Sequence, residues 1–375
     1  MSGDPIAGRV APGFEPVRDA FAANFHAGRE LGASFAVVRD GEVVVDLWGG
    51  WCDRARTRPW RADTLANVWS TTKGLAALCV ALLVDRGVLD YEAPVAKSWP
   101  EFAAAGKGAL TVAELMSHQA GLSGAAVPVT LRDLADHAKM AALLAAQTPF
   151  FPAGESGYHA LTHGVLAGEL VRRASGRTLG CFFAEEIAQP LGADAWIGLP
   201  ETEDGRAAEM EPPADAPSLP PPQHPAAHAA FLNPPPDPEA PNQRWWRAAE
   251  IPAANGQANA RALATVYGAL VGTGAQGGVR VLAPATLEAA TRVRVARPDH
   301  VLLLPMRWAA GFLRNLGGLY GPSDAAFGHS GWGGSFGCAD PEARLGIGYA
   351  MNRMDPNLVG DPRSLALIEA VYASL

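Results

Sequence analysis

The chain has 375 residues, of which 49% are hydrophobic, so it can bury a large core in one big domain or two closely packed ones. Its formal net charge is −8 and no run of Lys and Arg stands out, which argues against nucleic acid or an anionic membrane surface as a partner. It shows neither a signal-peptide pattern nor an apolar run of about 18 residues, so we expect a cytoplasmic protein without a membrane span that acts on small molecules.

The N-terminal region predicts a helix followed by a β-hairpin. Residues 14–27 carry apolar side chains at helical spacing, which indicates an amphipathic helix. Two apolar segments, 34–39 and 42–48, then flank Asp40-Gly41, a strong signal for a two-residue hairpin turn. We therefore expect strands close to the N-terminus, with a turn-rich segment after them.

The stretch Val68-Trp-Ser-Thr-Thr-Lys-Gly74 opens an apolar run that predicts a helix from about Ser70 to Arg86. Ser70 and Lys73 are three residues apart, so they share one face of the first turn. A hydroxyl then lies beside an amine at the positive end of a helix, where free backbone N–H groups can bind an anion. Ser-x-x-Lys alone is a weak signal, because an N-cap serine followed by a surface lysine explains most chance matches.

The middle of the chain is predicted to be mainly helical. Thr111 and Glu114 form a capping-box pattern before a helix at 110–117. Further helical patterns cover 131–146, 159–175, 179–188 and 258–270.

Residues 211–241 form a loop with twelve prolines, which exclude a regular helix and a central strand. The segment could be a disordered linker. Because it contains Phe231 and Leu232 and ends close to Trp245 and Trp246, we favour an ordered loop across a cleft.

The C-terminal part again predicts strands, at 308–313, 327–336 and 344–351, before an apolar helix at 364–375. Strands at both ends of the chain around a helical middle predict an α+β fold, with one antiparallel sheet built from both ends. We expect a discontinuous sheet domain of residues 1–95 and 285–375, and an inserted, mainly helical domain of residues 96–284 that includes the Pro-rich loop.

A serine nucleophile needs a base within hydrogen-bonding reach, and Lys73 and Tyr158 are the two candidates. Lowering the pKa of a lysine by about three units means disfavouring the ammonium by roughly 4 kcal/mol, which burial and a helix N-terminus both promote. Tyr158 could deprotonate Ser70 and later protonate the leaving oxygen, or could be a half-buried structural tyrosine. The spacing leaves open which residue is the principal base.

The segment Gly328-His-Ser-Gly-Trp-Gly-Gly334 is rich in glycine, which is typical of a strand whose backbone a ligand approaches closely. The N–H groups of Ser70 and Trp332 could form an oxyanion hole, typically worth about 3 to 4 kcal/mol per donor. A glycine-rich turn between edge strands is the alternative. The predicted substrate contacts are His329, Ser330, Gly331, Trp332 and Gly333, with Trp69, Trp245 and Trp246 as further apolar walls.

Histidines and cysteines give no sign of a metal site. No Cys-x-x-Cys pair occurs, and His159 and His163 lack the glutamate of a His-Glu-x-x-His motif. We expect no metal and no cofactor. His118 and His159 are interpreted as structural hydrogen-bonding residues.

Ser70-Thr-Thr-Lys73, Tyr158 and His329-Ser-Gly331 together resemble the serine β-lactamase and penicillin-binding-protein superfamily, in particular its class C-like branch and the family VIII carboxylesterases. The resemblance implies a β-lactamase-like fold with the site between its two parts. It also implies Ser70 as the acylated nucleophile, Lys73 and Tyr158 as the base system, and the N–H groups of Ser70 and Trp332 as the oxyanion hole.

Two departures from the class C pattern favour an esterase. Ala160 stands where those enzymes have an asparagine that binds a substrate amide, and His329 replaces the lysine that helps to hold the β-lactam carboxylate. Both changes weaken binding of penicillins more than binding of simple esters. Trp332-Gly-Gly334 also resembles the Trp-Gly-Gly signature of the esterases.

The expected function is therefore hydrolysis of small carboxylic esters with short to medium acyl chains through a Ser70 acyl-enzyme. The alternatives are a β-lactamase or D-amino-acid peptidase acting on amides, an acyltransferase, and a catalytically silent binding protein. A rival nucleophile, Ser335, lies in a Gly-x-Ser-x-Gly pattern, but the nucleophile elbow of α/β-hydrolases requires a histidine further along the chain. The last histidine is His329, upstream of Ser335, so that order is impossible.

Overall fold

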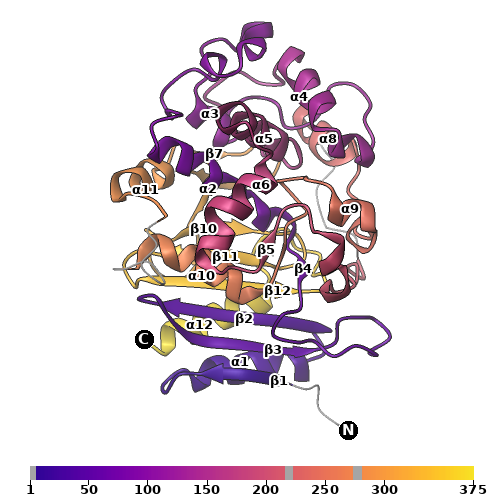
Figure 1. The fold of residues 1–375 in the computed structure, drawn as a ribbon, viewed down its shortest axis with the longest axis vertical. Helices are drawn as coiled ribbons and strands as arrows, with labels where there is room; N and C mark the ends of the chain where they lie inside the picture. The colour runs from indigo at the N-terminus through magenta and orange to yellow at the C-terminus, as the bar shows by residue number, and fades with distance from the viewer. Residues whose placement is uncertain (1–5, 216–222, 273–280) are drawn as a thin grey trace.

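The computed structural model describes residues 6–215, 223–272 and 281–375, and its centre is a nine-stranded sheet in which every pairing is antiparallel. Across the sheet the strands follow the order β1-β3-β2-β12-β11-β10-β9-β8-β7. Because β2 pairs with β12, the N-terminal hairpin lies directly beside the last strand of the chain (Figure 1). The prediction of one sheet built from both chain ends is confirmed. The strands are β1 Ile6–Val10, β2 Gly32–Arg39, β3 Glu42–Gly50, β7 Val295–Pro298, β8 Pro305–Trp308, β9 Leu313–Arg314, β10 Phe327–Ser330, β11 Phe336–Asp340 and β12 Leu345–Met351.

The hairpin between β2 and β3 has the predicted two-residue turn. Asp40 and Gly41 both have positive φ, at 50° and 84°, and Arg39 pairs with Glu42. Positive φ at both central residues is the geometry that matches the twist of paired strands, and Asp-Gly adopts it readily. The local sequence therefore decides this turn.

Helices pack on the sheet and hold its position. Helix α1 (Glu15–His26) packs against α12 (Pro362–Ala373), and α10 (Ala260–Val271) packs on β2, β11 and β12. A Cβ on Gly346 of β12 would lie 2.2 Å from the Gly268 nitrogen, so the absence of a side chain lets α10 approach the strand backbone.

Helix α2 (Thr72–Asp85) is the element from which the site is built. It contacts β10 of the sheet on one side and α5 (Thr162–Ser175) and α6 (Leu179–Phe183) on the other. Its residues from Thr72 to Leu83 are all buried, as expected for a helix that is apolar on every face. The one lysine on this helix is consequently buried as well.

A second, small sheet joins distant segments next to this helix. Its order is β4 (Ala66–Asn67), β6 (Gln257–Ala258) and β5 (Ala195–Trp196). The strand just before Ser70 therefore lies beside residues that follow the Pro-rich segment.

The helical region stands above the sheet in Figure 1. The capping box of Thr111 and Glu114 is present in both directions, as predicted.

The remaining helices are α3 Val112–Met116, α4 His137–Ala146, α7 Gln189–Leu191, α8 Pro225–Leu232, α9 Arg244–Ala248 and α11 Pro284–Thr291. A π-helical turn covers Ala184–Ala188, and 3-10 turns cover Trp69–Thr71, Val95–Lys97, Pro100–Gly106, Leu131–Ala135, Glu201–Arg206 and Ala240–Asn242.

Three sequence predictions about elements are corrected. Residues 211–241 do contain a helix, α8, because Pro225 occupies its first turn, where a missing N–H costs nothing, and alanines follow; residues 216–222 lie outside the described part. Residues 309–312 form a turn between the end of β8 at Trp308 and the start of β9 at Leu313, with Gly311 at φ +88°. Residues 327–336 hold β10, a turn and the first residue of β11. Strands β1 and β7 were not predicted.

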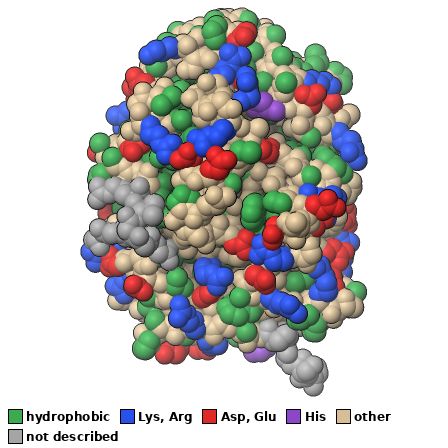
Figure 2. Space-filling view, in the orientation of Figure 1, with side chains coloured by type: hydrophobic (Ala, Val, Ile, Leu, Met, Phe, Trp, Pro, Cys, Tyr) green, Lys and Arg blue, Asp and Glu red, His purple; other side chains and the backbone are tan. Residues whose placement is uncertain are grey.

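The two-domain division at residues 95/96 and 284/285 stays a prediction. Helix α10 belongs to the predicted helical domain, residues 96–284, but it packs on the sheet. Within the described ranges no helix is both long and apolar enough to cross a membrane. On the face shown in Figure 2, acidic and basic side chains are interspersed rather than separated by sign.

Candidate active site

Ser70 lies in the 3-10 turn Trp69–Thr71 immediately before α2, which begins at Thr72 and not at about Ser70 as predicted. Trp69 has a positive φ of 44°, an uncommon conformation for a bulky residue that functional sites often retain. The Thr72 hydroxyl donates to the Trp69 carbonyl and accepts from the Gly256 N–H. Two chain segments thus fix the turn that carries Ser70.

The three predicted catalytic groups converge. Lys73 Nζ lies 3.0 Å from Ser70 Oγ, and the Tyr158 hydroxyl donates to the same oxygen at 2.8 Å. Lys73 Nζ also donates to the carbonyl oxygens of Ala160 at 2.7 Å and Ala253 at 2.9 Å. A hydroxyl, an amine and a phenol from two distant parts of the chain therefore share one site.

The surroundings of these groups set their protonation states. Burial lowers the pKa of Lys73 well below its usual value, and burial raises the pKa of Tyr158 above its usual 10. Both effects favour the uncharged forms. A neutral amine has two N–H groups and one lone pair, and the Ala160 and Ala253 carbonyls accept both hydrogens. The lone pair is then left for the hydrogen of the Ser70 hydroxyl.

Tyr158 is held by partners that sequence reasoning missed. Asp299 accepts the backbone N–H of Tyr158 at 2.9 Å and the indole N–H of Trp308 at 3.2 Å. The Trp308 ring stacks on Tyr158 with 5.6 Å between centroids. Asp299 is 141 residues away in sequence and belongs to no recognisable motif, so only the tertiary structure reveals it.

The buried histidines are neutral. His159 donates its backbone N–H to His118 Nδ1 and accepts the Leu122 N–H at Nε2, as expected of structural hydrogen-bonding residues. Burial lowers the pKa of His159 to about 4 and that of His329 to about 3. Among the described residues, no group of three or more potential ligands could hold a metal ion.

The glycine-rich strand packs against the turn that carries Ser70. A Cβ on Gly331 would lie 2.2 Å from the Val68 carbonyl oxygen, and one on Gly333 would lie within 3.0 Å of Met351 and Met354. Protein atoms, and not a ligand, fill this space. Neither Gly331 nor Gly333 lines the cavity described below, and their contact with substrate stays a prediction.

Ser335 contributes to the same contact between the glycine-rich strand and the turn that carries Ser70. Its hydroxyl donates to the Val68 carbonyl at 2.8 Å and lies 3.1 Å from Thr71 Oγ1. It is fully buried, which is consistent with a structural role and not with a nucleophile.

A cavity of about 100 Å³ opens beside Ser70. Trp69 and Trp332 line it as predicted, with their ring centroids 5.0 Å apart. Trp246 packs on Trp69 and its indole N–H donates to Asn67, and Trp245 packs against the Arg132 guanidinium. Neither residue lines this cavity, and their contact with substrate stays a prediction. The other lining residues are Tyr158, Ala160, Leu161, Ala230, Phe231, Pro236, Ala254, Leu302, Met306, Trp308, Leu313, His329, Ser330, Leu358 and Val359.

A larger cavity of about 880 Å³ is lined by residues of α4 and α5, but none of the predicted site residues borders it. The chemistry therefore belongs to the smaller cavity.

A model of the beta-lactamase family matches residues 17–371. The chain belongs to this family. It is 40% identical to the esterase/beta-lactamase LipL of Mycobacterium tuberculosis, over 96% of this chain and 85% of that protein. A solved family VIII carboxylesterase is 52% identical with a TM-score of 0.95, covering 99% of this chain and 100% of the other. A penicillin-binding-protein homologue from Caulobacter crescentus is 48% identical with a TM-score of 0.94, at the same coverage. The predicted family and fold are confirmed.

This beta-lactamase-family chain has a neutral ring where the family resemblance would place a lysine. His329 Nδ1 lies 2.8 Å from the Ser330 carbonyl oxygen. Because a carbonyl oxygen can only accept a hydrogen bond, Nδ1 carries the ring hydrogen, and Nε2 is unprotonated and has a free lone pair. Within the described residues Nε2 has no hydrogen-bond partner. The site consequently offers no positive charge at this position for a substrate carboxylate.

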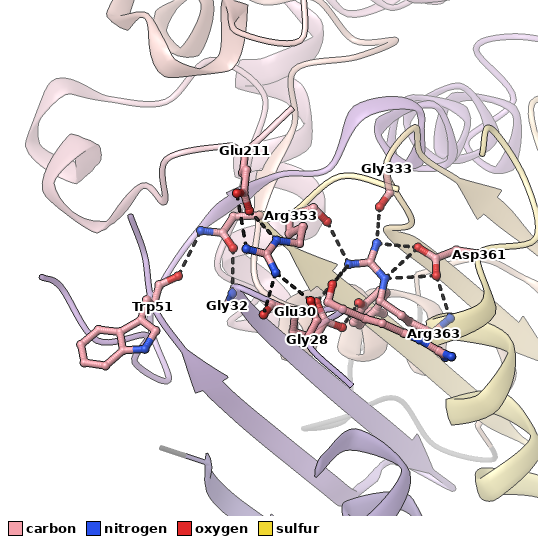
Figure 3. A network of polar contacts seen from close by, with 12 residues as sticks. Gly28, Glu30, Gly32, Trp51, Glu211, Gly333, Arg353, Asp361 and Arg363 are labelled. Carbon is pink, nitrogen blue, oxygen red and sulfur yellow. Dashed lines mark hydrogen bonds and ion pairs between the residues drawn. The ribbon is translucent and has the colours of Figure 1, made fainter. Parts of the chain in front are cut away.

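A buried ionic network supports the loop after Trp332 in this family member (Figure 3). Arg363 donates to the Gly333 carbonyl at 2.7 Å, to Asp361 at 2.6 Å and to Glu30 at 3.1 Å. Desolvation raises the pKa of Glu30 to about 7. The Arg363 guanidinium is shared between the carboxyl groups of Asp361 and Glu30. When Glu30 is neutral, the positive charge of Arg363 is balanced by the negative charge of Asp361.

Proposed function

We propose that this chain is a serine carboxylesterase that forms an acyl-enzyme at Ser70. The observation that carries the proposal is the convergence on Ser70 Oγ of a buried amine at 3.0 Å, whose pKa burial lowers, and a phenol at 2.8 Å. Relatives that match nearly the whole chain are named as an esterase and as a carboxylesterase. A cytoplasmic location stays a prediction.

In acylation the Lys73 lone pair takes the proton of Ser70 as Oγ attacks the ester carbonyl, and the N–H groups of Ser70 and Trp332 stabilise the oxyanion. The C–O bond to the alcohol then breaks, and Tyr158 donates its proton to the departing oxygen. The Lys73 ammonium returns a proton to Tyr158, which restores both neutral groups. In deacylation a water molecule takes the place of the alcohol, and Lys73 accepts its proton as the water oxygen bonds to the acyl carbon. The bond between the acyl carbon and Ser70 Oγ then breaks, the Lys73 ammonium gives that proton to Ser70 Oγ, and the carboxylic acid leaves.

The cavity favours uncharged substrates. Its lining is apolar apart from Ser70, Tyr158, His329 and Ser330, and no lining residue among those described is an acid, a lysine or an arginine. Its volume of about 100 Å³ is small beside the roughly 300 to 1,000 Å³ of sites for drug-sized ligands. We therefore propose simple esters with short to medium acyl chains as substrates.

A covalent probe tests the nucleophile. A fluorophosphonate should label Ser70, as located by mass spectrometry of peptides, and Ser70→Ala should lose both the label and turnover of p-nitrophenyl butyrate. Ser335→Ala is the matched control, because Ser335 lies in the rival motif and contacts the same turn. This variant should keep the label on Ser70. Label on Ser335, or turnover undiminished in Ser70→Ala, would contradict the proposal.

Hydrolysis of β-lactams is the second candidate, because one relative is named both esterase and beta-lactamase. Nitrocefin distinguishes the two functions. We expect turnover at least about 100-fold slower than that of the nitrophenyl ester, because the neutral His329 cannot pair with a carboxylate. Comparable rates would favour the β-lactamase.

A further inference from the structure

Helix α8 of the Pro-rich segment forms one wall of the cavity beside Ser70. Ala230 and Phe231 from this helix, together with Pro236 after it, line the cavity, as do residues of the sheet region such as Met306 and Leu313. The phenyl ring of Phe231 is the largest side chain that this segment contributes. The segment 211–241 therefore takes a direct part in shaping the site.

The wall is fixed rather than free to swing. Asn233, which ends α8, donates to the carbonyls of Ala125 at 2.9 Å and Val127 at 2.8 Å, and accepts from the Val129 N–H at 2.9 Å. A Cβ on Gly124 would lie 2.1 Å from the Ala229 carbonyl oxygen, so the absence of a side chain lets the loop pack directly on the helix backbone. A helix held in this way keeps the Phe231 ring at a fixed position in the cavity wall.

The group that this cavity holds is best assigned to the acid part of the ester. In a serine acyl transfer the acyl group takes part in both half-reactions, becoming bonded to Ser70 in the first and being released by water in the second, whereas the alcohol must leave before water enters. A small, apolar cavity bordered by Ser70 suits the group that stays. The alcohol instead requires a path outward.

We propose that Phe231 determines the longest acyl chain that this enzyme accepts. This inference rests on the proposed esterase function. Removing the ring joins its volume to the cavity, which admits longer chains. A larger ring at the same position shortens the cavity.

The test compares Phe231→Ala and Phe231→Trp with the wild type on p-nitrophenyl acetate, butyrate, hexanoate and octanoate. A pocket discriminates a single methylene by about 10- to 200-fold. We therefore expect the ratio of kcat/KM for octanoate to that for acetate to rise at least about tenfold in Phe231→Ala and to fall in Phe231→Trp. The two opposite substitutions keep the test decisive even where one variant is poorly folded.

Leu232→Ala is the matched control, since Leu232 follows Phe231 on the same helix but is 49% exposed and lies outside the cavity lining. It should keep the wild-type ratio. An unchanged ratio in both Phe231 variants, or a shift confined to a series of acetates with varied alcohols, would overturn the inference. Absence of turnover in the wild type on every ester would instead refute the proposed function.

Discussion

At the residue scale, the structure distinguishes the catalytic base from the proton donor, which the sequence alone did not. Lys73 is fully buried with two carbonyl partners for its hydrogens, while the Tyr158 phenol keeps its proton because burial raises its pKa. We therefore interpret Lys73 as the base and Tyr158 as the proton donor to the leaving group. The two assignments lead to separate experiments.

The first experiment varies the leaving group. Loss of a general acid matters most when the leaving oxygen is strongly basic, so Tyr158→Phe should lower kcat for an ethyl ester by about 10² to 10⁴ and for a p-nitrophenyl ester by much less. Tyr320→Phe is the control, because this buried phenol lies 3.0 Å from Ser330 Oγ and makes no hydrogen bond to Ser70. Equal losses on both esters in Tyr158→Phe would argue against proton donation by Tyr158.

The second experiment follows kcat/KM as a function of pH. Protonation removes the Lys73 lone pair, so activity should fall as the pH is lowered through its depressed pKa, and Tyr158 should cause no loss on the alkaline side below its usual pKa of 10. Burial lowers the pKa of His329 to about 3, so His329→Gln should keep the acid limb where it is in the wild type. Disappearance of that limb in His329→Gln would assign it to the histidine.

At the element scale, the contact between β10 and the 3-10 turn places Ser70. The turn reaches the strand because Gly331 has no side chain and because Ser335 bonds to Val68 and lies beside Thr71. Close packing of backbone on backbone leaves no room to relax. We therefore expect Gly331 to affect catalysis through the position of the nucleophile.

Gly331→Ala tests this contact. The added methyl group would lie 2.2 Å from the Val68 oxygen and should displace the turn, with a cost in stability of about 1 to 3 kcal/mol and at least a tenfold loss of kcat. Gly205→Ala is the control, because a Cβ there meets nothing within 4 Å. Enzyme kinetics and thermal unfolding of both variants measure the two effects. Wild-type kcat in Gly331→Ala would show that this contact does not position Ser70.

At the scale of the whole molecule, Arg363 ties together segments that are far apart in the chain. Its guanidinium on α12 bonds to Glu30 before β2 and to the Gly333 carbonyl beside the site. Desolvation raises the pKa of Glu30 from 4.5 to about 7, so the folded state binds a proton more tightly than the unfolded state. Glu30 therefore stabilises the fold fully below about pH 4.5, and this contribution is lost as the pH rises through about 7.

Glu30→Gln should remove this dependence. Between pH 5 and pH 8 the wild type should lose up to about 3 kcal/mol of unfolding free energy more than the variant, because the neutral amide does not titrate. Urea unfolding at the two pH values measures the difference. An equal change in unfolding free energy between pH 5 and pH 8 for the two proteins would show that Glu30 is already ionised at pH 5.

The sequence by itself determined the local features, because short-range patterns encode them. The Asp40-Gly41 turn, the Thr111 capping box and the placement of Ser70 and Lys73 one turn apart all depend on residues within a few positions of each other. The three motifs and the two departures from them, at Ala160 and His329, also predicted the family and the esterase class.

Only the tertiary structure decided the remaining features, since they depend on contacts between residues far apart in the chain. Asp299 meets Tyr158 and Gly331 meets Val68 through such contacts, and no local pattern records either pair. For the same reason Trp246 became a buried support, whereas Phe231 became a cavity wall. The protonation state of Lys73 likewise follows from burial of α2 between sheet and helices, because desolvation is a property of the assembled fold.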